Sequence, residues 1–79
     1  MTREEIIAKL IEFASIAFEK DAAGITEDTD IAAELGVKSV QRVSMAASIE
    51  NEFDVMVPVA RFDKFKTIGD FADFIMDEM

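Results

Sequence analysis

One serine stands out among the side chains of this 79-residue chain that could take part in chemistry. Ser39 follows the run Gly36-Val37-Lys38 and begins an apolar-periodic stretch that extends to Phe53. The chain contains no Cys and no His, so it lacks a thiol nucleophile, the commonest general base and the commonest metal ligand. A serine nucleophile activated by histidine is therefore excluded. What remains is a hydroxyl at a junction between a loop and a helix.

Carboxylates are the other groups that could bind a metal or exchange protons. The run Asp28-Thr29-Asp30 is typical of the start of a calcium-binding loop. However, Ala32, Ala33 and Ser39 stand where that loop needs a ligand, a Gly and a Glu. Most other acids fall at polar helical positions, which favours a solvated face over paired carboxylates in a deep pocket. We expect no metal site and no catalytic residue, so the protein is not expected to be an enzyme.

The charge of the chain limits its partners. Seventeen acidic and eight basic residues give a net charge of −9, and nucleic acid is not an expected partner because phosphate binding requires clustered Lys and Arg. The charge is unevenly spread. Residues 1–37 and 67–79 are strongly acidic, whereas residues 38–66 carry five basic and four acidic side chains. The segment that begins beside Ser39 is therefore the least acidic part of the chain.

Length and hydropathy indicate one small domain covering residues 1–79. Apolar residues make up 51% of the chain and include seven Phe, which is enough for a single core. No apolar run is long enough to span a bilayer, and the N-terminus has no basic run before an apolar core. We expect a cytoplasmic monomer that does not insert into membranes.

Helical periodicity dominates the first part of the chain. From Arg3 to about Glu19, the apolar residues fall within one arc at helical pitch, which predicts an amphipathic helix. Ile16 lies off this arc and is expected to be exposed. Residues 20–38 predict a long connection with a short helical turn over Ile31–Leu35. The core-facing residues expected in the helix and the connection are Ile6, Ile7, Leu10, Ile11, Phe13, Ala14, Ala17, Phe18, Ile25, Ile31 and Leu35.

Three further helices are predicted. Ser39 is expected to be the N-cap of a helix that ends near Glu52 and has a wide apolar arc. A short helix is expected over Val59–Lys64. Thr67 with Asp70 three residues on resembles a capping box, which predicts a last helix reaching the C-terminus. The fold class is therefore an all-α, small four-helix bundle of three main helices and one short helix. The arc of the helix after Ser39 comprises Val40, Val43, Ala46, Ala47, Ile49 and Phe53.

Several short motifs of this chain, and the spacing between them, resemble those of the acyl carrier proteins. The family pattern is Leu-Gly-x-Asp-Ser-Leu, followed along the next helix by Leu-Glu-x-x-Phe. This chain has Leu35-Gly36-Val37-Lys38-Ser39-Val40 and then Ile49-Glu50 and Phe53. The residues that carry the resemblance are Ile25–Asp30, Glu34–Gly36, Ser39, Val40, Val43, Ile49, Glu50, Glu52–Asp54, Val57, Pro58, Lys64 and Thr67–Asp70.

The resemblance implies that Ser39 carries 4′-phosphopantetheine in a phosphodiester linkage, whose thiol holds acyl groups as thioesters. It implies a holo-acyl-carrier-protein synthase that uses coenzyme A and Mg²⁺ as one partner. Acyl-transferring and condensing enzymes of fatty-acid, polyketide or related synthesis are the others. Three alternatives stay open: a carrier of aminoacyl or peptidyl groups, a small helical interaction module that is never modified, and a serine that acts only as an N-cap.

The chain departs from the family beside the serine. Lys38 stands where the family has Asp, and uncharged polar residues form a stripe on a helix that is usually acidic. This pattern predicts a dedicated set of partner enzymes, with drift on a solvated surface as the alternative. The residues expected to contact partners are Lys38, Val40, Gln41, Arg42, Ser44, Ala47, Asn51 and Arg61, and Ser48 completes the uncharged stripe.

Side-chain sizes also depart from the family. Ala46 and Ala47 are small where larger residues are usual, and Phe62 and Phe65 are large where smaller residues are usual. A volume-conserving repacking of the core explains this exchange most simply. The functional alternative is an acyl pocket of altered shape. The residues expected to line that pocket are Val43, Ala47, Val57, Phe62, Ile68, Phe71 and Ile75.

Overall fold

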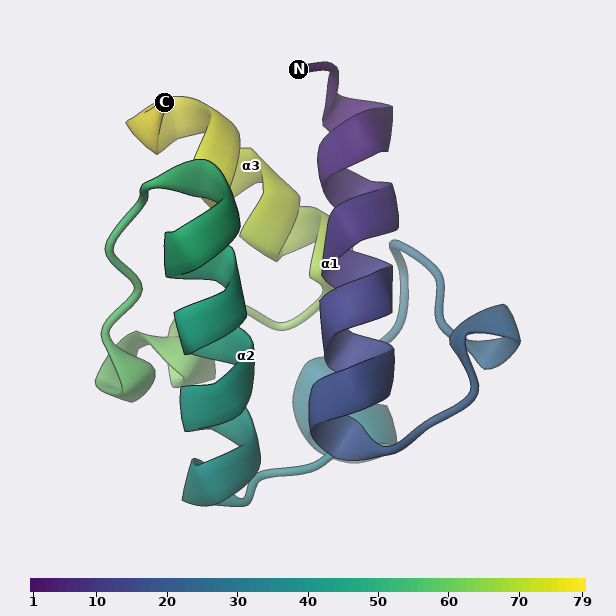
Figure 1. Cartoon of the computed structure of the whole chain (residues 1–79). Coiled ribbons are helices and arrows are strands. Elements are labelled where there is room, and N and C mark those ends of the chain that lie inside the picture. The colour runs from purple at the N-terminus through teal and green to yellow at the C-terminus, as the bar shows by residue number, and fades with distance from the viewer.

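Three main helices and three short ones form the fold in the computed structural model, which describes all residues 1–79 (Figure 1). The main helices are α1 (Arg3–Phe18), α2 (Ser39–Phe53) and α3 (Ile68–Glu78). The short ones are η1 (Ala22–Gly24), η2 (Ile31–Leu35) and η3 (Val59–Lys64). The predicted all-α class is confirmed, and the helices begin and end within about one residue of the predicted bounds, as expected for helix ends.

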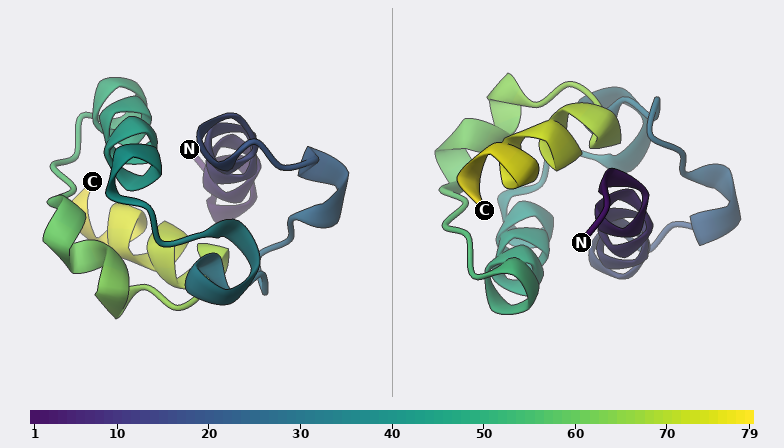
Figure 2. Two further views of the ribbon diagram at one scale, coloured as in Figure 1. Left: turned by 90° about the horizontal axis from the view of Figure 1, so that it is seen from below. Right: turned by 90° about the horizontal axis from the view of Figure 1, so that it is seen from above.

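Helices α1 and α2 run side by side in opposite directions, and α3 crosses behind both (Figures 1 and 2). The short helix η3 packs against α2 on the side away from α1 and leads into α3 (Figure 1). One apolar core fills the space between these elements. Ile6, Leu10, Ala14 and Phe18 face it from α1, whereas Ile16 is 70% exposed, as predicted.

The long connection between α1 and α2 is held by backbone hydrogen bonds to the start of α3. Ile31 N–H donates to Lys66 O at 2.9 Å, and Gly69 N–H donates to Glu27 O at 2.8 Å. Gly69 permits this close approach, because an added Cβ would lie 3.2 Å from Glu27 O. The three apolar residues predicted to anchor the connection, Ile25, Ile31 and Leu35, are all buried.

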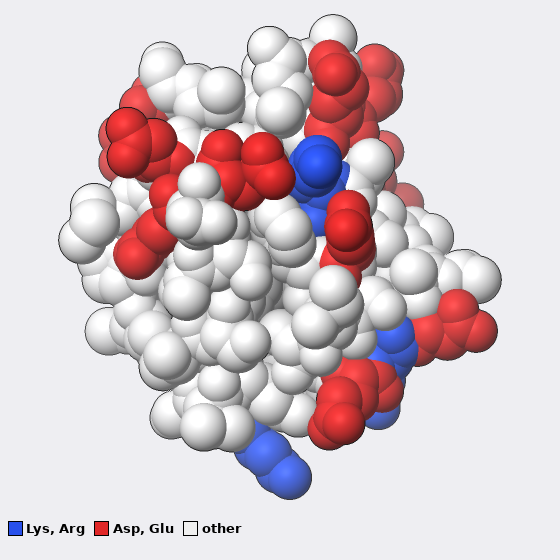
Figure 3. Space-filling model, viewed as in Figure 1, with Lys and Arg blue, Asp and Glu red and all other residues white.

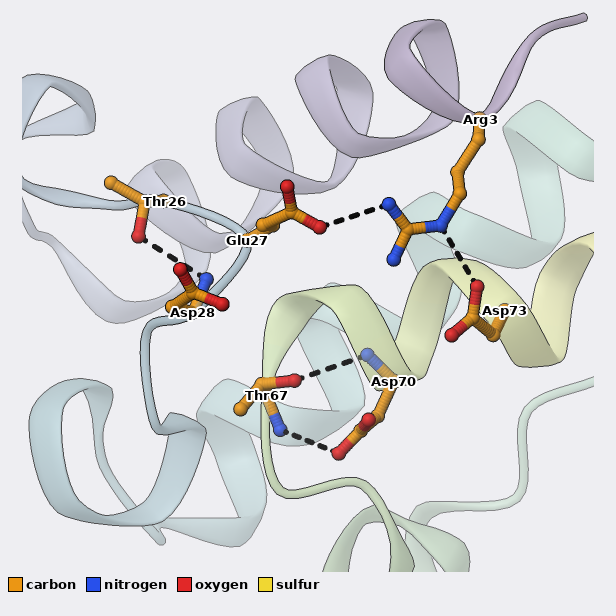
Figure 4. A network of polar contacts seen from close by, with 7 residues as sticks. All are labelled: Arg3, Thr26, Glu27, Asp28, Thr67, Asp70 and Asp73. Atoms are coloured by element: carbon orange, nitrogen blue, oxygen red, sulfur yellow. Dashed lines mark hydrogen bonds and ion pairs between the residues drawn. The ribbon is translucent and has the colours of Figure 1, made fainter.

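Helices α1 and α3 both begin with a complete capping box. In α3, Thr67 Oγ1 accepts a hydrogen bond from Asp70 N–H, and Asp70 Oδ2 accepts one from Thr67 N–H (Figure 4). In α1, Thr2 and Glu5 make the same reciprocal pair. Each box satisfies N–H groups that the helix itself cannot. The box at α3 was predicted, and the one at α1 was not.

Arg3 ties the two capped helices to the connection. Its Nη1 lies 2.9 Å from Glu27 Oε2, and its Nε lies 2.9 Å from Asp73 Oδ1 (Figure 4). These hydrogen bonds, the one to Asp73 first, raise the pKa of Arg3 above its usual range. The α1–α3 side of the molecule is thus cross-linked by polar contacts at its surface.

The buried face of α2 differs from the predicted arc. Val40 is 77% exposed, Val43 is 51% exposed and Ala47 is exposed, so these three residues of the predicted apolar arc do not pack into the core. The prediction that Val43 and Ala47 line an interior pocket is therefore wrong. The helix carries two apolar stripes, and the one with the larger side chains is buried. Met45, which the predicted arc omitted, is fully buried. The residues on the buried face are Arg42, Met45, Ala46, Ile49 and Phe53.

Candidate functional site

Ser39 is the first residue of α2, and Lys38 takes the N-cap position with an extended backbone (φ −69°, ψ 129°). The prediction that Ser39 is the N-cap is therefore wrong by one residue. Its backbone is already helical, so its hydroxyl does not cap the first turn, and no other side chain does. Ser39 is exposed. The alternative in which Ser39 serves only as a cap fails, because the side chain makes no cap.

The first two backbone N–H groups of α2, those of Ser39 and Val40, have no partner in the chain. Gln41 N–H and Arg42 N–H both donate to Lys38 O at 3.1 Å, whereas the N–H groups of Ser39 and Val40 find no acceptor. These groups lie at the positive end of the helix dipole. An anion attached to Ser39 would therefore sit beside unpaired donors, which is the environment that a phosphate favours. The residues present fit a phosphodiester at this position.

Gly36 brings the chain into α2. Its N–H donates to Ile31 O at 2.9 Å and closes the turn of η2. Its φ of +153° is one that residues with a side chain rarely adopt, and an added Cβ would lie 3.0 Å from Gln41 Oε1. The backbone angle is what requires glycine here, because the end of the flexible Gln41 side chain could move aside.

Lys38 places a positive charge beside the start of α2. It is exposed, and none of the four ion pairs of the structure includes it. A cation at a helix N-terminus is unfavourable, because it adds to the positive end of the dipole. A negative group on Ser39 would offset this repulsion.

The outer face of α2 carries most of the residues predicted to contact partners. Val40, Ser44, Ala47 and Asn51 are exposed there, and Gln41 is half-buried. Seen from the side of α2, this part of the surface is largely free of charge, with acidic side chains gathered toward the C-terminal end of the helix (Figure 3). We call the exposed residues Val40, Val43, Ser44, Ala47 and Asn51 the α2 outer face.

Arg61 and Arg42 were predicted to add positive charge to this surface, and only Arg61 is exposed. The Arg61 guanidinium lies 4.8 Å from the centre of the Phe74 ring. Arg42 is 8% exposed and forms an ion pair with Asp63 of η3, with Nη1 2.9 Å from Oδ1. The prediction of a surface charge at Arg42 is wrong, because its side chain joins the buried face of α2.

The residues predicted to line an acyl pocket divide into two groups. Val57, Phe62, Ile68, Phe71 and Ile75 are buried in one core, where the Phe62 and Phe71 ring centres lie 5.1 Å apart. Val43 and Ala47 are exposed and do not face that core. Met45, Ala46 and Ile49 take their place on α2. The five buried residues together with these three are packed without a cavity.

A pocket of about 220 Å³ lies elsewhere, on the side of the connection between α1 and α2. Its lining residues are Lys20, Asp21, Gly24, Ile25, Thr29, Glu34 and Leu35. No group of three or more acidic side chains is arranged to hold a metal ion. None of the helices has the length and apolar character required to cross a membrane.

Comparisons with known proteins point to one family. The family model described as "phosphopantetheine attachment site" matches residues 5–75. An acyl carrier protein of Lactobacillus acidophilus is 33% identical over 75 residues, covering 95% of this chain and 94% of the relative. An acyl carrier protein of Thermotoga maritima is 32% identical, covering 94% and 91%. A mitochondrial acyl carrier protein of Arabidopsis thaliana is 26% identical, covering 96% of this chain and 58% of the relative.

Proposed function

Because this chain belongs to the acyl carrier proteins, we propose that it carries acyl groups as thioesters on a 4′-phosphopantetheine attached to Ser39. Acyl carrier proteins are not enzymes, and members of the family hold this group covalently. The enzymes served are proposed to be a holo-acyl-carrier-protein synthase and the acyl-transferring and condensing enzymes of fatty-acid, polyketide or related synthesis.

The observation that carries the proposal is the state of the eight hydroxyl side chains of the chain. Six of them are engaged in hydrogen bonds within the chain, as caps, turn acceptors or helix contacts. The other two are Ser39 and Ser44, both exposed on α2. Ser44 lies inside the helix, whereas Ser39 lies at its start beside unpaired N–H groups. Only Ser39 combines an available hydroxyl with an environment that favours a phosphate.

The chain supplies a nucleophile and a binding environment, and it supplies no base. In the attachment step, a bond forms between Ser39 Oγ and phosphorus while the pyrophosphate bond of coenzyme A breaks and releases adenosine bisphosphate. A base of the synthase accepts the serine proton, since this chain has no His. Lys38 and the N–H groups of Ser39 and Val40 lie beside the attachment position and would stabilise the charge of a phosphate there. When bound, the group supplies a mobile thiol for thioester formation.

Intact mass spectrometry tests the attachment. The chain is incubated with coenzyme A, Mg²⁺ and a broad-range holo-synthase, alongside Ser39→Ala and the matched control Ser44→Ala. We expect the mass of one phosphopantetheine to be added to the parent and to Ser44→Ala, and none to Ser39→Ala. Equal modification of Ser39→Ala would contradict the proposal. No gain in any variant with any synthase would favour an unmodified interaction module.

The α2 outer face supports a narrower proposal about partners. It presents Val40, Val43 and Ala47 among uncharged polar residues, with Lys38 at its N-terminal end. Charged faces accelerate encounters with partners of opposite charge, and like charges reject wrong partners. A neutral face is suited to enzymes whose docking surface is apolar. It is less suited to enzymes whose docking surface is a basic patch that binds acidic carriers. Burial of Arg42 strengthens this proposal, because no cation interrupts the face after Lys38.

Turnover by a condensing enzyme of standard fatty-acid synthesis tests this choice of partner. We expect weak turnover that changes little with ionic strength, since few charges steer the encounter. Val43→Glu adds an acidic group to the α2 outer face and should raise turnover at low salt. Ala8→Glu, on the exposed surface of α1, is the matched control and should leave turnover unchanged. Efficient turnover of the parent would contradict a dedicated partner set.

A further inference from the structure

Arg42 is the only charged side chain buried in this protein. It is 8% exposed, and the remaining buried residues are apolar, Gly69 or Thr29. Removing a guanidinium from water is unfavourable unless its donors are satisfied within the protein. The position is one turn after Ser39 on α2, so the two residues are neighbours along the helix. A buried charge so close to the attachment site requires a physical explanation.

The contacts of Arg42 satisfy only part of its guanidinium. Nη1 lies 2.9 Å from Asp63 Oδ1, and the guanidinium carbon lies 5.6 Å from the centre of the Phe62 ring. The Asp63 side chain is 79% exposed, so the ion pair reaches solvent on the η3 side. Nε is buried and has no hydrogen-bond partner. Such an orphaned donor is costly and uncommon in a folded protein.

The unpaired Nε–H lies where α2 meets η3. Phe62 of η3, which Arg42 contacts, is among the buried residues predicted to receive an acyl chain. The core beside this donor is packed without a cavity, so an acyl chain would reach it only by moving α2 and η3 apart. A saturated acyl chain in that position would have only its thioester oxygen to offer the donor. An acyl chain with an oxygen on its third carbon offers a second acceptor. The charges of Arg42 and Asp63 already neutralise each other. An acyl group that ends in a carboxylate would add an unpaired charge, so a neutral oxygen is the better acceptor.

We propose that Arg42 is a specificity-determining residue whose Nε–H donates a hydrogen bond to a neutral oxygen on the third carbon of the acyl group. The preferred cargo is therefore a 3-oxoacyl or 3-hydroxyacyl group, rather than a saturated or carboxylated group of the same length. This inference rests on the proposed function, since the acyl group reaches Arg42 only from Ser39. A purely structural Arg42 would join α2 to η3 equally well whatever the cargo.

Thermal unfolding of loaded forms tests the proposal. The chain is loaded from butyryl-, 3-hydroxybutyryl- and succinyl-coenzyme A, and loading is verified by mass. We expect the 3-hydroxybutyryl form to melt about 4–8 °C above the butyryl form, the shift that one additional hydrogen bond produces in a domain of this size. The succinyl form should show no such gain.

Two variants separate the effect of the Nε–H donor of Arg42 from the effect of its positive charge. Arg42→Lys keeps a cation for Asp63 and lacks Nε–H, so the melting difference between the 3-hydroxybutyryl and butyryl forms should disappear. Asp63→Asn keeps Nε–H, so the difference should persist even if both forms melt lower. If Arg42→Lys does not fold, NMR of the three arginine Nε–H groups in the parent gives the same answer. Exchange of the Arg42 Nε–H should slow with the 3-hydroxybutyryl group and not with the butyryl group.

The outcomes keep this inference separate from the proposed function. Loading with no melting difference in the parent, or with an equal difference in Arg42→Lys, would overturn the role of Arg42 and leave the carrier function intact. Failure to load any acyl group would overturn the carrier function and this inference with it.

Discussion

The starts of α2 and α3 satisfy their backbone N–H groups in opposite ways. At α3, Thr67 and Asp70 complete the first turn from within the chain. At α2, Lys38 provides no side-chain cap, and the exposed Ser39 follows it. The chain thus stabilises one helix start with its own side chains and leaves the other available to an attached anion. If Ser39 carries the proposed phosphopantetheine, stability and function lie at different helix ends of the same core.

The largest expected effect comes from the core beneath α2 and η3. Phe62→Ala should lower the free energy of unfolding by about 3–5 kcal/mol, because Phe62 is 1% exposed and packs on Phe71. It should also change which acyl chain lengths stabilise the loaded protein, if the acyl group enters there. Unfolding of apo and acyl forms of increasing length measures both effects.

A phenylalanine on the other side of the core serves as the control. Phe18→Ala, in α1, removes a side chain that is 2% exposed and should destabilise every acyl form alike. Phe62→Leu replaces Phe62→Ala if the larger deletion does not fold. The same chain-length dependence in the Phe62 and Phe18 variants would refute an acyl pocket at Phe62.

Removal of the α3 cap should have a smaller effect that is independent of modification. Thr67→Ala is expected to lower the free energy of unfolding by about 1 kcal/mol, since it deletes the oxygen that accepts from Asp70 N–H. Thr67→Ser keeps that oxygen and should retain most of the stability. Chemical denaturation of the apo and modified proteins should show the same loss, and a loss that depends on modification would argue against the contrast between the two helix starts.

Adding a side-chain cap to α2 would make its start similar to that of α3. Lys38→Asp should raise the stability of the unmodified protein by about 0.5–1 kcal/mol, because Asp can accept from the first turn and suits the helix dipole. The gain should shrink in the modified protein, where the carboxylate and the phosphate repel each other. Lys38→Asn adds a neutral cap, so its stabilising effect should fall less on modification than that of Lys38→Asp. Equal stabilisation of both forms by Lys38→Asp would show that the phosphate does not use the start of α2.

The smallest effect is a pH dependence at the start of α1. Hydrogen bonds from Thr2, the backbone N–H first, lower the pKa of Glu5 below its usual value of 4.5. A carboxylate with a lowered pKa stabilises the folded state above its unfolded pKa, and this contribution is lost as the pH falls through the folded pKa. Parent and Glu5→Gln should therefore differ most at neutral pH and converge as the pH falls from 4.5 through the lower folded pKa of Glu5. A difference that stays constant with pH would contradict this assignment.

Local patterns predicted the helices because each has its own signal in the sequence. Apolar periodicity located α1, and Thr67 with Asp70 located the start of α3. The same capping signal is present at Thr2 and Glu5, so the cap of α1 could also have been predicted from the sequence. These features depend on neighbours along the chain, and they are therefore accessible to sequence reasoning.

Features that depend on packing were not accessible in this way. Helix α2 carries two apolar stripes, and only contact with α1 and η3 decides that Met45 is buried and Val40 is exposed. Arg42 was expected at the surface because charge usually is, and its burial depends on Asp63 and Phe62 of a different element. The spacing of the motifs that resemble the family predicted Ser39 as the attachment residue. Its unpaired N–H groups became visible only in the structure.

The central claim is that the exposed serine at the uncapped start of α2 holds the phosphopantetheine. Trypsin cleavage after Arg42 separates Ser39 from Ser44, the other exposed serine of the helix with an unengaged hydroxyl. Tandem mass spectrometry of the modified chain should place the phosphopantetheine on the peptide that contains Ser39 and ends at Arg42. Finding it on the peptide that begins at Val43, or on any other hydroxyl of the chain, would contradict the account.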